Sequence, residues 1–165
     1  MRTIRVRPLE QHQVALCFPL AHLAVPELTS QSWELFTEGH LGLQHLDRNG
    51  ILIAEVENGC ILGLVIYQFD RHPVQGRTLL VKNLIAHDYF TSGRKSVEQA
   101  LIEAIEALAL RRGCNAVHIL MPLREAEPRR PGLRHALEAH GHSVNGLSFC
   151  KPLAIENGED GAAWD

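Results

Sequence analysis

ILIAEVENGCILG, residues 51–63, is the stretch of sequence that decides the fold. Two runs rich in aliphatic and β-branched residues flank Asn58-Gly59. This dipeptide tolerates positive φ and favours a type I′ turn between antiparallel strands. The pattern therefore predicts a β-hairpin over Ile51–Phe69.

Strands and helices are predicted on both sides of this hairpin. Thr78–Ala86 is rich in Leu, Val and Ile and follows a loop that contains Pro and Gly, which predicts a third long strand. Thr3–Pro8 alternates apolar and charged residues and predicts a short first strand. Gln11–Leu46 has apolar residues at helical spacing, interrupted near Pro26, and predicts two short helices.

The second half of the chain predicts a helix followed by a covered strand. Ser96–Arg112 carries an apolar stripe at helical spacing, Ser96 and Gln99 fit a capping box, and Gly113 is placed as the stop. Ala116–Met121 is a short run that is apolar except for His118, typical of a strand buried in a sheet.

The remaining elements complete one domain. Leu133–His140 predicts a short helix, and Ser143–Leu153 predicts a last strand or a bent pair of strands. The order β-αα-βββ-α-β-α-β belongs to the α/β (α+β) class, with a mixed, mostly antiparallel central sheet flanked by helices. Residues 1–155 are expected to form this single domain, and residues 156–165 a disordered tail.

Composition narrows the function classes. The 165 residues are 45% hydrophobic, enough for one core, and the formal charge of -3 comes without a basic block, so nucleic acid is not an expected partner. Four widely spaced cysteines suit a reducing cytoplasm. No signal peptide is recognised. The longest apolar run, Val14–Val25, is interrupted by Pro19 and too short to span a bilayer, so no membrane partner is expected.

The element order and three motifs resemble the GNAT (N-acetyltransferase-like) superfamily, as a divergent member. The motifs are IAEVENGCILG (53–63), VKNLIAH (81–87) and the helix from Ala100 to Gly113. The resemblance covers roughly Thr3–Leu153 and implies that acetyl-CoA or another acyl-CoA is the co-substrate. In this superfamily the fourth strand splays from the fifth, and the pantetheine arm of the acyl-CoA lies in the gap. The backbone donors would then lie around Leu84, Ile85 and Ala86.

The resemblance also implies a phosphate-binding loop before the central helix. The family pattern of Gln or Arg, two residues, Gly, one residue, then Gly or Ala falls on residues 93–98, with Ser96 and Glu98 in the glycine places. A shifted alignment over residues 91–96 gives a small-residue turn with two cations. The residues expected to hold the phosphates are Gly93, Arg94, Lys95, Ser96 and Val97. The alternative is a solvated turn before an amphipathic helix.

The family's catalytic pair does not transfer to this sequence. Its base on the fourth strand is matched by Lys82, and its tyrosine acid on the last helix by Leu137. His87, His135 and Tyr89 are the substitute candidates, because imidazole titrates near neutral pH and a phenol can donate a proton. Each histidine can equally be an ordinary surface or hydrogen-bonded residue.

The resulting hypothesis is an acyl-CoA-dependent N-acyltransferase that moves an acyl group, such as acetyl, directly to a small-molecule or N-terminal amine. The alternatives are a non-catalytic GNAT-like interaction domain and an acyltransferase that uses a carrier-linked acyl donor. His140-Gly141-His142 lacks further ligands at a recognisable spacing, so no metal site is predicted. A cytoplasmic location is expected, and a homodimer through edge strands stays open.

Overall fold

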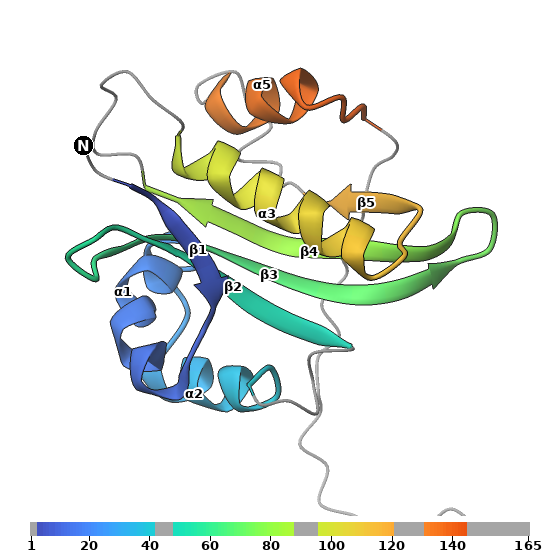
Figure 1. Ribbon diagram of the computed structural model, residues 1–165. Coiled ribbons are helices and arrows are strands. Elements are labelled where there is room, and N and C mark those ends of the chain that lie inside the picture. The colour runs from blue at the N-terminus through green and yellow to red at the C-terminus, as the bar shows by residue number, and fades with distance from the viewer. Residues whose placement is uncertain (1–2, 42–47, 88–95, 121–130, 145–165) are drawn as a thin grey trace, which may run out of the picture.

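A computed structural model of the chain describes residues 3–41, 48–87, 96–120 and 131–144. A five-stranded sheet lies between helices on its two faces (Figure 1). The elements are β1 (Arg5–Pro8), η1 (Gln11–Gln13), α1 (Val14–Ala24), α2 (Ser30–Glu38), β2 (Asn49–Glu55), β3 (Ile61–His72), β4 (Gly76–Ala86), α3 (Val97–Arg111), β5 (Ala116–Ile119) and α5 (Pro131–Ala139).

The strands lie in the sheet in chain order, β1 to β5. The first four pair antiparallel, and β5 pairs parallel to β4 after the α3 crossover. The α/β class and the predicted order are confirmed through the last helix. The predicted strand Ser143–Leu153 falls almost wholly outside the described residues, and the tail 156–165 lies outside them too. None of the described helices has the length and apolar content needed to cross a membrane.

The hairpin is confirmed, but its predicted turn type is wrong. Gly59 has φ +77°, whereas no residue other than glycine has positive φ in the described part of the chain, so Asn58 cannot complete a type I′ turn. The Gly59 N–H donates to the Val56 carbonyl at 2.8 Å, and the Val56 N–H to the Cys60 carbonyl at 3.0 Å. This is a three-residue loop ending in a left-handed glycine, the next most common solution after the two-residue turns.

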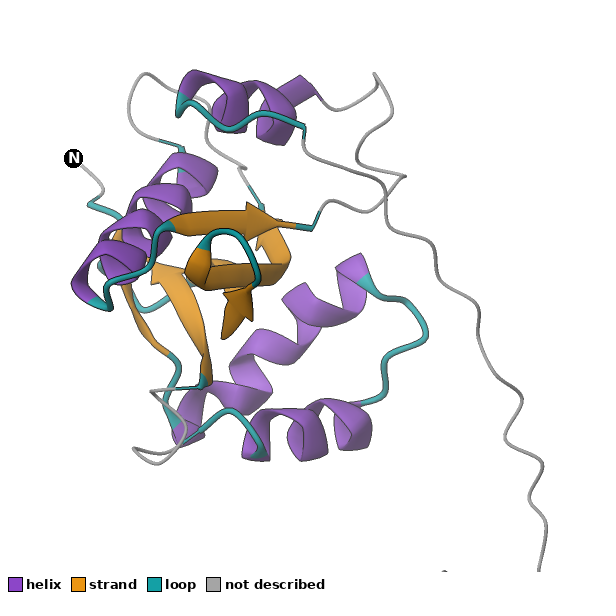
Figure 2. Ribbon diagram, turned by 90° about the vertical axis from the view of Figure 1, so that its right-hand side faces the viewer, coloured by secondary structure: helices purple, strands orange, loops and turns teal. Residues whose placement is uncertain are grey.

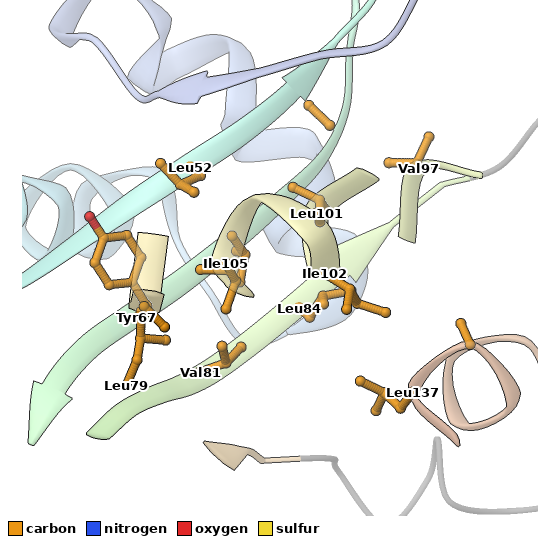
Figure 3. Close-up of a cluster of buried hydrophobic side chains, with 14 residues drawn as sticks. Leu52, Tyr67, Leu79, Val81, Leu84, Val97, Leu101, Ile102, Ile105 and Leu137 are labelled. Carbon is orange, nitrogen blue, oxygen red and sulfur yellow. The ribbon is translucent and has the colours of Figure 1, made fainter. Parts of the chain in front are cut away.

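Two apolar clusters hold the helices on opposite faces of the sheet, because successive strand residues point to opposite faces (Figure 2). Ile53 and Leu64 face α1 and α2, whereas Leu52 and Val65 face α3. Figure 3 shows the cluster on the α3 face of the sheet, called the α3 cluster below. Into it α3 buries Leu101 together with Val97 and Ile105, which lie one turn before and after it. The first two helices and the central helix therefore each cover one face.

An ion pair joins β1 to β2 and makes stability depend on pH. Arg7 donates to both carboxylate oxygens of Glu55, at 2.7 and 3.1 Å, and Gln13 adds a 3.4 Å bond. The hydrogen bond from Arg7 is the main reason that the pKa of Glu55 lies below its ordinary value of 4.5. A lowered carboxyl pKa stabilises the fold above the unfolded-state pKa, and the contribution is lost as pH falls through the folded-state value.

We expect Glu55→Gln to be less stable than the wild type at pH 7, and the gap to shrink as pH falls below about 4.5. Urea denaturation of both proteins across this range measures the gap. A gap that does not change with pH would show that the carboxylate charge contributes nothing.

Candidate functional site

A β-bulge divides β4, and within the described part of the chain the half after the bulge pairs on one side only. Asn83 lies opposite Ile66 and Val81 opposite Tyr67, so Lys82 is the extra residue. The parallel ladder with β5 also ends at Val81. Within the described residues, 82–86 of β4 therefore pair with β3 alone, and Figure 1 shows β4 continuing past the tip of β5.

The bulge changes which backbone groups face away from β3. Before it, the carbonyls of Arg77 and Val81 accept from the chain at β5, at 2.8 and 2.9 Å. After it, the His87 N–H donates to the Leu62 carbonyl of β3, at 2.8 Å. Because peptide groups alternate sides along a strand, those of Leu84 and Ala86 point to the open side.

Of the three residues singled out from the sequence, Leu84 and Ala86 thus present backbone donors and acceptors to the open edge. The peptide groups of Ile85, by the same alternation, point toward β3. The side chain of Leu84 is buried in the α3 cluster, and that of Ile85 packs on the opposite face. The open edge therefore presents main-chain N–H and C=O groups, while the side chains of Leu84 and Ile85 pack into the core on either face of the sheet.

The start of α3 lies against the same half of the sheet. Gly63 is opposite Ala86, and a Cβ built on Gly63 would lie 2.7 Å from the Val97 side chain. Val97 is the first residue of α3 and is 1% exposed. The positive end of the α3 dipole consequently lies close to the open edge of β4.

The predicted capping box at this helix start is confirmed. The Ser96 hydroxyl accepts from the Gln99 N–H at 3.1 Å, and the Gln99 side chain accepts from the Ser96 N–H at 3.1 Å. Two of the first N–H groups of the helix are therefore engaged within the protein itself. Gly93, Arg94 and Lys95 lie outside the described residues.

The candidate catalytic residues stand in different settings. His87 follows β4 directly, is half-buried and has an interaction partner in the fold. His135 is exposed on α5, whose buried residues are Ala136 and Leu137. Tyr89 lies outside the described residues. Of the two candidates that the structure describes, His87 lies next to the open edge, by its position in the chain, and His135 does not.

Two positions matched to the family's catalytic pair have structural roles here. Lys82 forms the bulge and is exposed, whereas Leu137 is 7% exposed and packs in the α3 cluster. The bulge itself has no recognisable signal in the sequence. Gly63 does have one, because a glycine inside a strand often marks a close approach of another element.

Two other titratable side chains, Tyr67 and Cys17, are buried in the apolar core. Tyr67 is 3% exposed, and burial raises its pKa (Figure 3). Burial likewise raises the pKa of Cys17 to about 12, which makes it a poor nucleophile.

His140 and His142 both face Glu106 of α3. The His142 ring lies 3.0 Å from the Glu106 carboxylate and the His140 ring 3.7 Å from it. Gly141 between them has φ +83°, which turns the chain after α5, and the His142 N–H donates to the Leu137 carbonyl. This is a helix C-cap that holds α5 on α3. No group of three or more metal-ligating side chains is found in the described ranges.

Comparisons with known proteins give matches in structure alone. No family model matches the chain, and no curated protein matches its sequence. An aminoglycoside N-acetyltransferase, AAC(6′)-Iy, solved in complex with CoA, aligns with a TM-score of 0.73 at 14% identity, covering 93% of this chain and 97% of its own.

Two further solved structures align over nearly their full length. Glucosamine-6-phosphate N-acetyltransferase from Arabidopsis thaliana gives a TM-score of 0.68 at 16% identity, over 92% of this chain and 99% of its own. Ribosomal-protein-alanine N-acetyltransferase from Brucella melitensis biovar Abortus 2308 gives 0.66 at 18% identity, over 92% and 100%. At these identities the similarity establishes the fold.

Proposed function

Since the chain has the fold of the GNAT N-acetyltransferases, we propose that it is an acyl-CoA-dependent N-acyltransferase, with acetyl-CoA as donor and a small-molecule or N-terminal amine as acceptor. One observation carries the proposal. The bulge at Lys82 and the end of the β5 ladder at Val81 coincide, and among the described residues no strand pairs with the edge of β4 beyond them, beside the start of α3.

This edge suits the pantetheine arm of an acyl-CoA. An extended ligand with amide groups can add to an open strand edge through main-chain hydrogen bonds. The N–H groups of Leu84 and Ala86 are the donors on this edge, and one of them can also polarise the thioester carbonyl, where negative charge develops during acyl transfer.

The phosphates would lie at the start of α3. Gly93, Arg94, Lys95, Ser96 and Val97 remain the proposed contacts, because a helix N-terminus and two cations attract anions. Ser96 would act by holding the helix start in place, since both its hydroxyl and its N–H are engaged by Gln99.

Acyl transfer then needs positioning and one proton transfer. The neutral amine attacks the thioester carbonyl carbon, a C–N bond forms, the C–S bond breaks and the thiolate leaves. Holding both reactants on one edge can supply about 7–11 kcal/mol of the barrier. His87 is the proposed base for the amine proton, and Tyr89 and His135 remain the candidates for protonating the thiolate.

The direct test is titration calorimetry of the full chain with acetyl-CoA and with CoA. We expect binding, and we expect Ala86→Pro to weaken it about tenfold, because one edge N–H bond contributes about 1–1.5 kcal/mol. Proline at this place removes an N–H that points away from β3 and so leaves the ladder with β3 intact. Ala86→Gly, which keeps the N–H, is the matched control and should bind like the wild type.

Two further results bear on the assignment. Weaker binding after a double Arg94→Gln and Lys95→Gln substitution would support the phosphate contacts. Failure of the wild type to bind either nucleotide would contradict the CoA mechanism and favour a carrier-linked donor or a non-catalytic interaction domain, as the engaged N–H groups of Ser96 and Gln99 would allow.

A further inference from the structure

Two arginines lie over one aromatic ring at the end of the sheet opposite the open edge, and a third lies on the neighbouring strand position. Phe69 of β3 has the Arg77 guanidinium carbon 5.1 Å from its ring centroid and that of Arg112 at 6.0 Å. Arg71 lies directly opposite Arg77 across the β3–β4 ladder. Figure 1 shows the end of β3, the start of β4 and the end of α3 together on one side of the molecule.

This arrangement has an electrostatic cost. Like charges directly opposite each other on antiparallel strands are destabilising. Arg71 and Arg77 are both exposed, and within the described residues neither is ion-paired to a carboxylate. Contact with the Phe69 ring holds the Arg77 guanidinium in place but leaves its charge uncompensated. Arg71 and Arg77 therefore form a cluster of positive charge that an anionic ligand would stabilise.

The same chain contains a segment of complementary chemistry. Residues 156–165, ENGEDGAAWD, carry four acidic side chains and no Lys, Arg or His, and they include Trp164. Carboxylates are the preferred partners of guanidinium groups, and an indole is the best aromatic partner for a cation. The twelve residues from 145 to 156 can span up to about 40 Å, the scale of a domain of this size.

We propose that residues 156–165 dock in cis on the cluster of Arg71 and Arg77. The site is distinct from the proposed acyl-donor edge, because Arg77 and Ala86 are nine residues apart on β4, about 30 Å along an extended strand. A tethered segment binds at a high effective concentration, so a few charged contacts suffice to hold it.

Tryptophan fluorescence tests the docking directly, because the chain has two tryptophans and Trp33 is 2% exposed. Acrylamide quenching of the full chain, minus that of Trp164→Phe, reports Trp164 alone. We expect its quenching constant to rise at least twofold in the Arg71→Gln/Arg77→Gln variant and in 0.5 M NaCl, which screens charges beyond about 4–5 Å.

The matched control is Arg5→Gln/Arg134→Gln, which also removes two positive charges, one from β1 and one from α5. It should leave Trp164 quenching as in the wild type. Arg71→Gln alone guards against misfolding, because it relieves the repulsion with Arg77 and should not lower stability, yet it should raise quenching.

Equal quenching in the wild type and the cluster variant would overturn the proposal. So would an equal rise in the control pair, which would show a general charge effect. A quenching constant that changes on tenfold dilution would overturn the assignment to the same chain, because docking in cis is independent of concentration.

Discussion

Replacing Trp33 by alanine is expected to lower the free energy of unfolding by about 3–5 kcal/mol, because large aromatic truncations in a core leave a cavity. Trp33 is 2% exposed and lies in the apolar cluster on the sheet face that α1 and α2 cover. Its indole N–H donates to the Val14 carbonyl at 2.7 Å. Its ring also stacks on Phe36. Chemical denaturation followed by circular dichroism measures the loss.

Trp33→Phe separates the two contributions. It keeps most of the apolar volume but removes the donor to Val14, so it should cost less than the alanine variant. If the two variants were equally unstable, the hydrogen bond rather than the buried ring would hold α1 to α2. A loss below 1 kcal/mol for Trp33→Ala would contradict the packing described here.

Gly63→Val is expected to have the largest effect on ligand binding. A Cβ at this position would lie 2.7 Å from the Val97 side chain and 3.0 Å from both the Ile85 carbonyl and the Leu101 side chain. Overpacking of this kind costs about 1–3 kcal/mol. The first turn of α3 must move away from β3, so CoA binding should be lost in calorimetry while the thermal transition remains cooperative.

Gly59→Ala is the matched control for this variant. A side chain is unfavourable at Gly59 as well, but the reason is backbone strain at its φ of +77°. No atom lies within 4 Å of a Cβ built there, so a side chain would not clash. The control should therefore lose a comparable stability, about 1–2 kcal/mol, and keep CoA binding. Equal affinity in Gly63→Val and the wild type would show that the close approach of α3 does not shape the site.

The parts of the fold that sequence predicts are those decided locally. The Ser96 capping box, the Gly113 helix stop and the hairpin around Gly59 each depend on residues a few positions apart, and all are present. The exact turn was missed because Asn58 keeps negative φ, which the dipeptide pattern does not reveal.

The features of the candidate site depend on distant pairings. The bulge at Lys82 exists because β3 and β4 pair on both sides of it, and the sequence around Lys82 carries no Gly or Pro to announce it. Likewise, only the fold brings His142 to Glu106. Such contacts are set by the register and packing of whole elements, so no local pattern encodes them.

The edge of β4 that no described strand pairs with also bears on the solubility of this protein. A bare strand edge can recruit an edge from another copy, and it is a common starting point for aggregation. Lys82, the exposed charge at the bulge, is the kind of residue that opposes such contact, because the bulge twists the edge and the ammonium group resists burial. A ligand that covers the edge would add to this protection, so the unliganded protein should be the form that precipitates first on concentration.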